Sequence, residues 1–161
     1  MLIVLNDVLS EQHRYSVRSR FIASFDARMM RWTANTFNAL ESDLSPTALL
    51  LKTAGKFFDL TGMTGYECWA HYGTRPDWHV DKDEQQYKLT GEVRTPLCSI
   101  VYYADVDVLG GAFVTKMERI VPATNRMLVF APGIEHSVEP YEGTRLSIAI
   151  NPWAEKPLDY V

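Results

Sequence analysis

Two histidines and an aspartate in this sequence have the types and spacing of a metal-binding set. His79 and Asp81 are two residues apart at the end of a short extended piece, Asp77 to Val80. Side chains two apart on an extended chain point to the same side. His136 follows the Pro132-Gly133 turn after a strand and could complete the set. We therefore predict that His79, Asp81 and His136 are three ligands of one metal.

Arg145, nine residues after His136, adds a second chemical function. Two imidazoles and one carboxylate leave open metal positions opposite them, as is typical of non-heme Fe(II) oxygenases. The Arg145 guanidinium could hold the carboxylate of an organic cosubstrate through two parallel hydrogen bonds. The alternative is that Arg145 lies at an exposed edge or pairs with a structural acid.

The alternation of residue types from Thr144 to Asn151 gives this strand two different faces. One face is apolar enough to lie under helices, and the other is polar and small enough to line a wet interior. The apolar face comprises Leu146, Ile148 and Ile150, and the polar face comprises Arg145, Ser147 and Ala149. An arginine on the inner face is costly unless an anion meets it.

The elements that must position these residues change in kind near residue 60. The pattern from about Ser10 to Asp59 is helical, with Phe21, Phe25, Met29 and Trp32 at helical spacing. Ser45 and Pro46 favour the start of another helix that continues to Phe57-Phe58.

Short strands separated by turn residues follow this helical part. They are expected at Tyr66 to Tyr72, Leu97 to Ala104, Ala112 to Thr115, Glu118 to Val121, Met127 to Ala131, Ser137 to Pro140 and Thr144 to Asn151. We therefore predict a mainly β fold with N-terminal helices (α+β), a jelly roll with the helices packed on its larger sheet.

The composition fits one domain of 161 residues, with helical support at about 10–59 and a barrel at about 64–153. The net charge of −4 does not favour nucleic acid. The apolar run Met1 to Leu5 is too short for a signal peptide or a membrane span. Cys68 and Cys98 are expected to be free thiols, so we expect a cytoplasmic protein without a membrane partner. The sequence leaves its oligomeric state open.

Three further features near the expected metal site have two interpretations each. The polar segment Lys82 to Thr95 is either a lid over the site or a solvated connector. Trp78 either stacks on a substrate or packs against the protein. His71 and His13 have no partner pattern, and we expect both to be structural or surface residues.

The motifs taken together resemble a known family. In order they are His79-Val80-Asp81, Val101-Tyr102-Tyr103, Gly110-Gly111-Ala112-Phe113, Arg126 to Phe130, His136-Ser137-Val138 and Thr144 to Ile148. This order is similar to that of the 2-oxoglutarate/Fe(II)-dependent dioxygenases, and most of all to their prolyl-hydroxylase-like branch. The resemblance covers about residues 66 to 153 and implies a double-stranded β-helix.

The resemblance also implies roles for single residues. His79, Asp81 and His136 match the iron ligands of the family. Arg145 matches the residue that grips the distal carboxylate of 2-oxoglutarate, and Ser147 matches the hydroxyl beside it. Tyr103 and Tyr72 match tyrosines of the same pocket, although each could be an ordinary strand aromatic.

The implied activity is hydroxylation of a C–H bond with Fe(II), 2-oxoglutarate and dioxygen, which releases succinate and carbon dioxide and allows ascorbate as a reductant. A prolyl or other peptide side chain leads as the substrate, followed by a free amino acid or small metabolite. Two rivals remain: a cupin-like metalloenzyme that does not use 2-oxoglutarate, and a non-catalytic jelly-roll binding module.

Overall fold

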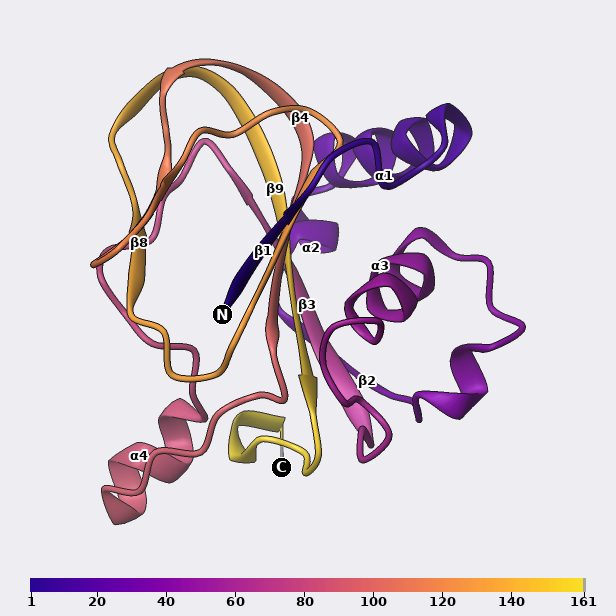
Figure 1. Cartoon of the computed structure of the whole chain (residues 1–161), viewed down its shortest axis with the longest axis vertical. Coiled ribbons are helices and arrows are strands. Elements are labelled where there is room, and N and C mark those ends of the chain that lie inside the picture. The colour runs from indigo at the N-terminus through magenta and orange to yellow at the C-terminus, as the bar shows by residue number, and fades with distance from the viewer. Residues whose placement is uncertain (161) are drawn as a thin grey trace.

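Two antiparallel β-sheets face each other in the computed structural model, which describes residues 1–160 (Figure 1). The larger sheet has the strand order β1-β7-β4-β9-β3-β2, and the smaller sheet has the order β6-β5-β8. The strands are β1 (Leu2–Leu5), β2 (Arg31–Ala34), β3 (Gly65–Tyr72), β4 (Ser99–Gly110), β5 (Phe113–Thr115), β6 (Arg119–Ile120), β7 (Arg126–Phe130), β8 (His136–Val138) and β9 (Tyr141–Trp153). The mainly β, jelly-roll-like fold class that the sequence predicts is confirmed.

The helices are short, and three of the four α-helices come before β3. They are α1 (Glu11–Ala23), α2 (Phe25–Arg28), α3 (Pro46–Ala54) and α4 (Glu84–Thr90), with two 3-10 turns, η1 (Asn38–Leu40) and η2 (Leu158–Tyr160). The Ser45 side chain accepts a hydrogen bond from the backbone N–H of Ala48 at 3.3 Å, and Pro46 opens the helix. The predicted start of α3 is therefore correct, but the helix ends at Ala54 rather than at Phe57-Phe58.

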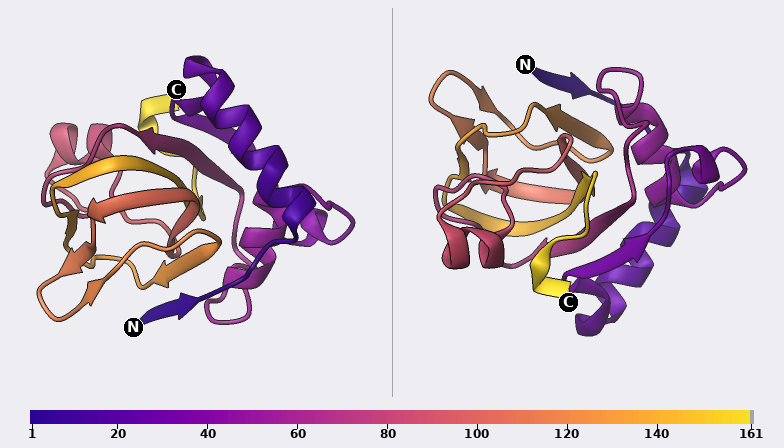
Figure 2. Two further views of the ribbon diagram at one scale, coloured as in Figure 1. Left: turned by 90° about the horizontal axis from the view of Figure 1, so that it is seen from above. Right: turned by 90° about the horizontal axis from the view of Figure 1, so that it is seen from below.

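The larger sheet is covered on its outer side by α1, α2 and α3 (Figure 2). Val17 and Phe21 of α1 and Leu50 and Leu51 of α3 belong to one buried cluster. The same cluster contains the sheet residues Ile100, Tyr102, Leu146, Ile148 and Ile150. The apolar face that the alternation in β9 predicts therefore lies in this layer of the protein.

A second, smaller cluster lies on the inner side of the larger sheet. Its buried members are Tyr103, Phe113, Leu128 and Phe130, which come from β4, β5 and β7. Because the inner space holds fewer apolar side chains, part of it is left for polar residues.

The helical spacing of Phe21, Phe25, Met29 and Trp32 predicts a helix that includes Trp32, and this prediction is wrong for Trp32. Trp32 lies in β2, which pairs with β3 through register partners such as Trp32 and Glu67. The periodic aromatic residues of this segment reflect a helix followed by an edge strand. The strand β1 was likewise not predicted from the sequence, and it pairs with β7.

The strand β4 runs to Gly110, which is beyond the predicted end at Ala104. An irregularity between Tyr103 and Asp105 shifts the register against β9, and pairing then continues to Gly110. Ala104 therefore has no register partner on β9, as at a β-bulge. The next residue, Gly111, has a φ of 73°, and an added Cβ there would lie 3.4 Å from the Arg145 Cδ. The added Cβ would crowd Tyr141 more closely, at 3.1 Å from its Cβ, and the positive φ disfavours a side chain there in any case.

The segment Lys82 to Thr95, which the sequence interprets either as a lid or as a solvated connector, contains the helix α4. Asp83 caps this helix by accepting from the Gln86 N–H at 2.9 Å. The other carboxylate oxygen accepts from the Leu158 N–H at 2.9 Å and pairs with Arg94. Because the Asp83 side chain is fully buried, this network ties α4 to the C-terminal turn η2.

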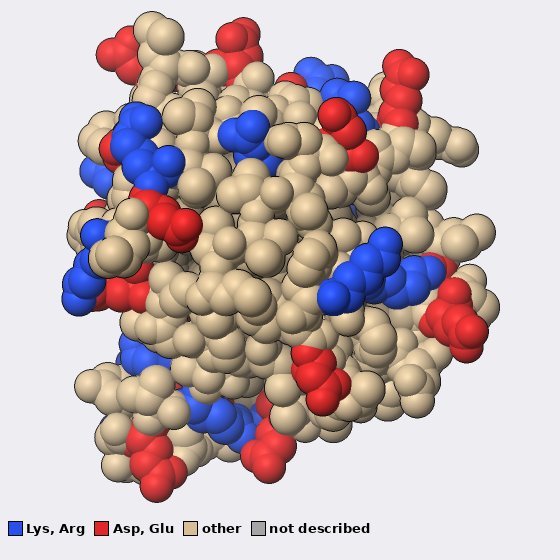
Figure 3. All heavy atoms as spheres, viewed as in Figure 1, with Lys and Arg blue, Asp and Glu red and all other residues tan. Residues whose placement is uncertain are grey.

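Charged side chains of both signs are interspersed on the face shown in Figure 3. Within residues 1–160, no helix has both the length and the apolar character needed to cross a bilayer.

Candidate metal centre

The chain segment before α4 and the strand β8 bring His79 beside His136. The two residues form an isolated antiparallel bridge, in which each backbone N–H donates to the carbonyl of the other at 3.0 and 2.9 Å. His79 thus extends the smaller sheet by one residue beyond β8. This pairing fixes two residues that are distant in sequence on one side of the sheet.

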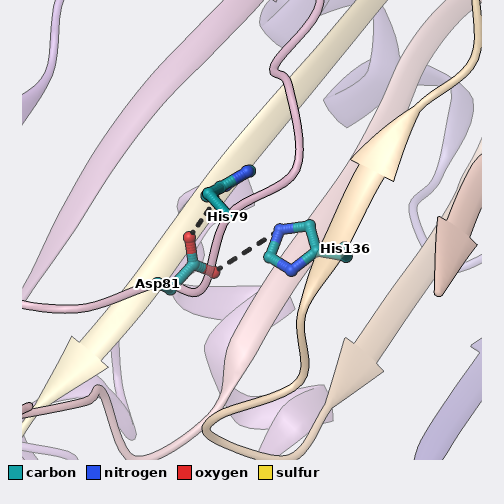
Figure 4. Close-up of side chains that lie close together, drawn as sticks. All are labelled: His79, Asp81 and His136. Carbon is teal, nitrogen blue, oxygen red and sulfur yellow. Dashed lines mark ion pairs between the residues drawn. The ribbon is translucent and has the colours of Figure 1, made fainter. Parts of the chain in front are cut away.

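His79, Asp81 and His136 converge (Figure 4), with the candidate ligand atoms of all three within 4.8 Å of one another. The His79 Nε2 lies 3.4 Å from one Asp81 carboxylate oxygen, and the His136 Nε2 lies 4.0 Å from the other. The donor set of two imidazoles and one carboxylate fits a first-row divalent metal.

Backbone carbonyls fix the protonation pattern of both rings. The His79 Nδ1 lies 2.7 Å from the Asp77 carbonyl oxygen, and the His136 Nδ1 lies 2.9 Å from that of Ile134. A carbonyl only accepts, so each Nδ1 carries the proton and donates it. The Nε2 atoms face Asp81, and once the rings are neutral, as metal binding requires, these atoms present their lone pairs on that side.

Electrostatics favour an ionised Asp81 between the two rings. Burial opposes this charge, but hydrogen bonding to His79 and Ser99 and the nearby His136 together hold the Asp81 pKa below its usual value. The Ser99 hydroxyl donates to the Asp81 carboxylate at 2.6 Å. Hydrogen bonding to Asp81 raises the pKa of His79, whereas burial lowers that of His136. A carboxylate held in its charged form between two histidines is suited to a cation.

The three residues line a cavity with about 420 Å³ of empty space, part of which is open to solvent. The same cavity is lined by Arg145, Ser147 and Ala149, the polar face that the sequence predicts for β9. Arg145 is 1% exposed, and its Nη1 donates to the Ser147 hydroxyl at 3.1 Å. It therefore lies neither at an exposed edge nor, among the described residues, in an ion pair with an acid.

Two buried polar atoms lack hydrogen-bond partners on this side of the larger sheet: the Nε of Arg145, which lines the cavity, and the hydroxyl of Tyr103, the register partner of Ser147. The Arg145 guanidinium carbon lies 5.1 Å from the centroid of the Tyr103 ring. Burial raises the pKa of Tyr103, so its hydroxyl keeps its proton and can donate. Unpartnered buried donors are costly, and an anion placed between them would accept from both.

The structure does not bring Tyr72 to this cavity. Tyr72 pairs in register with Leu146 and packs with the cluster under the helices, and the Arg28 guanidinium lies 5.0 Å from its ring centroid. Its neighbour His71 pairs with Ser147 and lines the cavity instead. The pocket position that the resemblance implies for Tyr72 is therefore wrong, because successive residues of a strand face opposite sides.

Some residues of the site were missed in the sequence. Trp69 and His71 line the cavity, and the Trp69 indole N–H donates to the His71 Nε2 at 3.1 Å. Phe113 stacks on the His136 ring at 5.1 Å between centroids. The alternation in β3 paired against that in β9 would have indicated Trp69 and His71. Nothing in the local sequence pointed to Ser99, and Phe113 belonged to one of the family motifs without a role being assigned to it.

The fold is shared with solved oxygenase structures of low sequence identity. A prolyl-4-hydroxylase from Pseudomonas putida superposes with a TM-score of 0.63 at 16% identity, covering 94% of this chain and 84% of that one. A viral collagen prolyl hydroxylase from Paramecium bursaria Chlorella virus-1, in complex with 2-oxoglutarate, gives 0.56 at 12% identity and covers 96% of each chain. A Trichoplax adhaerens prolyl hydroxylase with a hypoxia-inducible-factor peptide fragment gives 0.54 at 13%, covering 99% and 86%.

No protein-family model matches the sequence, and no curated protein matches it either. The likeness is therefore one of fold: the chain has a prolyl-hydroxylase-like 2-oxoglutarate oxygenase fold.

Proposed function

We propose that this protein is an Fe(II)- and 2-oxoglutarate-dependent dioxygenase that hydroxylates a C–H bond of a peptide side chain or another small organic group. His79, Asp81 and His136 would hold the iron. Bound there, iron supplies the activation of dioxygen that couples oxidation of 2-oxoglutarate to succinate and carbon dioxide with hydroxylation of the substrate.

The observation that carries this proposal is the buried Arg145 beside a candidate metal-ligand set. A guanidinium that is 1% exposed, with an unpartnered Nε, calls for an anion. A dicarboxylate that reaches from the ligand set to Arg145 would provide one. The cupin and binding-module interpretations give Arg145 no such partner.

The other residues have positioning roles in this proposal. Ser147 holds one arm of the Arg145 guanidinium, and the Tyr103 hydroxyl is free to donate to the same carboxylate. The Asp77 and Ile134 carbonyls orient the two imidazoles, and Ser99 orients Asp81. The apolar lining from Ile100, Val101 and Phe113 excludes water from the cosubstrate.

A peptide substrate is supported by the fold neighbour that was solved with a peptide fragment. The two chains are 13% identical, so this comparison supports a shared fold only. The kind of side chain that is hydroxylated depends on the residues of this chain that contact the substrate.

The test is direct. Anaerobic protein with Fe(II) should develop a metal-to-ligand charge-transfer absorbance when 2-oxoglutarate is added, and aerobic protein should convert 2-oxoglutarate to succinate slowly without substrate. Absence of both in well-folded protein would leave the cupin-like and binding-module alternatives.

A further inference from the structure

A second, wider cavity opens over the candidate metal centre, with about 810 Å³ of empty space that includes open solvent. It shares Trp69, His71, Pro76, His79 and Asp81 with the inner cavity. Its remaining lining comes from Met30, Glu67, Asp77, Trp78, Val80, Lys82, Glu84, Asn151 and Asp159. A substrate that reaches the metal from outside would pass through this space.

Glu67 is the most unusual residue of this outer cavity. It is only 5% exposed, and among residues 1–160 no cationic side chain pairs with it. The Trp153 indole N–H donates to its carboxylate at 2.8 Å. The side-chain oxygen of a neutral glutamine could also accept a hydrogen bond from the indole. This hydrogen bond therefore does not explain why the position holds a carboxylic acid. Burial raises the Glu67 pKa, hydrogen bonding to Trp153 and Tyr160 opposes that rise, and the charges of Asp81 and Asp159 add to it.

Asn151 lies directly opposite Glu67 in the sheet, as its register partner on β9. It is 3% exposed and lines the same cavity. Its backbone is paired in the sheet, whereas its side-chain amide makes no hydrogen bond within the described chain. The amide atoms are not among the fully buried side-chain atoms that lack a partner, so they are accessible from the cavity and can bond a ligand there.

The surroundings of this pair favour a positive ligand. Asp159 adds a carboxylate at the mouth that forms no ion pair within the described part of the chain. The Lys82 ammonium is bound to Glu84 at 2.8 Å. His71 has a pKa of about 4 because burial disfavours its charged form, so it is neutral at neutral pH. Trp69 supplies the aromatic ring type that attracts cations most strongly.

We propose that the outer cavity binds a cationic nitrogen of the substrate, an ammonium or a guanidinium group, which donates hydrogen bonds to the Glu67 carboxylate and the Asn151 amide oxygen. The proposal rests on the proposed function in one respect: the bound group would belong to the molecule that is hydroxylated at the neighbouring metal centre.

Direct binding tests this proposal without requiring turnover. Calorimetric titrations of the full chain, with and without Zn(II), would use N-acetyl-lysinamide and N-acetyl-argininamide as probes. Their neutral counterparts are Nε-acetylated N-acetyl-lysinamide and N-acetyl-citrullinamide. The cationic probes should bind at least about tenfold more tightly than the neutral ones, the loss expected for one charged hydrogen bond.

Variants locate the binding. Glu67→Gln keeps an acceptor for Trp153 and should weaken the cationic probes at least about tenfold, with little change for the neutral probes. Asp159→Asn, at an exposed position that cannot disturb the core, should weaken them about two- to threefold. The matched control is Glu142→Gln, a charge removed at an exposed position of β9, which should leave probe binding unchanged.

The source of the cation is resolved by comparing free L-lysine and L-arginine with blocked tripeptides that contain them. Tighter binding of either form supports the proposal and assigns a small molecule or a peptide as the source. Equal binding of cationic and neutral probes, no binding of either, or a Glu67→Gln variant that binds like the parent would overturn it. Turnover of 2-oxoglutarate by the same parent would then leave the proposed function intact. Cation binding without 2-oxoglutarate binding would instead overturn the proposed function alone.

Discussion

Arg145 carries a full positive charge into a position where only 1% of its surface is exposed. Ser147 accepts one of its hydrogen bonds, and the Tyr103 and Tyr141 rings lie 5.1 and 5.7 Å from its guanidinium carbon. Aromatic rings and one hydroxyl offset part of the desolvation, but they do not neutralise the charge. Arg145 is therefore suited to bind an anionic ligand. Replacing Arg145 should weaken the binding of that ligand more than the binding of the metal.

Arg145→Ala should leave metal binding nearly intact and weaken 2-oxoglutarate by about 2–5 kcal/mol, or about 30- to several-thousand-fold. Arg145→Lys should recover only part of this affinity, because an ammonium cannot reproduce the planar fork. Ser147→Ala should cost about 0.5–1.5 kcal/mol, as for one ordinary hydrogen bond. Anaerobic charge-transfer titrations would measure all three, with the exposed Arg119→Ala as a control. If Arg145→Ala bound 2-oxoglutarate like the parent, Arg145 would have a structural role.

His71 gives a prediction on pH. Burial lowers its pKa from 6.5 to about 4, so between these values the unfolded chain binds more protons than the folded one. Stability should therefore be complete above about pH 6.5 and fall as the pH decreases toward 4, by at most about 3 kcal/mol from this residue.

Urea unfolding of the metal-free protein at about pH 7 and pH 4.5 would measure this loss. His71→Gln should lose less stability over that interval than the parent, because glutamine does not titrate. His13→Gln is the matched control on the surface of α1, and it should retain the pH dependence of the parent. An equal loss in His71→Gln and the parent would show that His71 is not the group responsible.

At the scale of elements, β9 separates two environments along one strand. Leu146, Ile148 and Ile150 pack with residues of α1 and α3, while Arg145 and Ser147 line the inner cavity. A shift of one residue in its register would exchange these faces and place a charge under the helices. Pairing with β3 on one side and β4 on the other holds β9 in place.

Ile148→Ala should therefore lower the free energy of unfolding by about 2–4 kcal/mol, through lost burial and the cavity that remains. Chemical denaturation would measure the change. Leu109→Ala, at a position of β4 that is 78% exposed, should change stability by less than about 0.5 kcal/mol. Equal stability of Ile148→Ala and the parent would contradict the assignment of this face.

At the scale of the whole molecule, the candidate ligands come from segments that only the facing sheets bring together. His79 and Asp81 lie between β3 and α4, whereas His136 begins β8. A metal bound to all three would join these segments in the folded state alone. Because such a ligand binds the folded protein and not the unfolded chain, it must raise the stability.

Zn(II), Co(II) or Ni(II) at a hundredfold excess over its Kd should raise the stability by about 2.7 kcal/mol, seen as a higher melting temperature. Any of these ions is informative, because the usual affinity order does not favour Fe(II). His79→Ala and His136→Ala should lose most of the increase, and a chelator should reverse it in the parent. His13→Ala is the control and should keep the increase. An equal rise in the His79→Ala variant would place the metal elsewhere.

The sequence by itself determined the fold class, most of the strands and which residues share a face of β9. It also picked out His79, Asp81, His136 and Arg145 as the residues to be brought together, because metal-ligand types and strand alternation are local properties of the chain. Local pattern failed where pairing decides the structure: β2 and β1 are strands because β3 and β7 offer free edges to them.

The tertiary structure alone decided what surrounds those residues. Tyr72 faces the helices and His71 the cavity because the pairing of β3 with β9 sets their sides. Ser99 reaches Asp81, and Phe113 stacks on His136, through contacts between segments that no short-range pattern links. That Arg145 and Glu67 form no ion pair within residues 1–160 is likewise a property of the packed molecule, since a charge counts as unpaired only once every neighbour is in place.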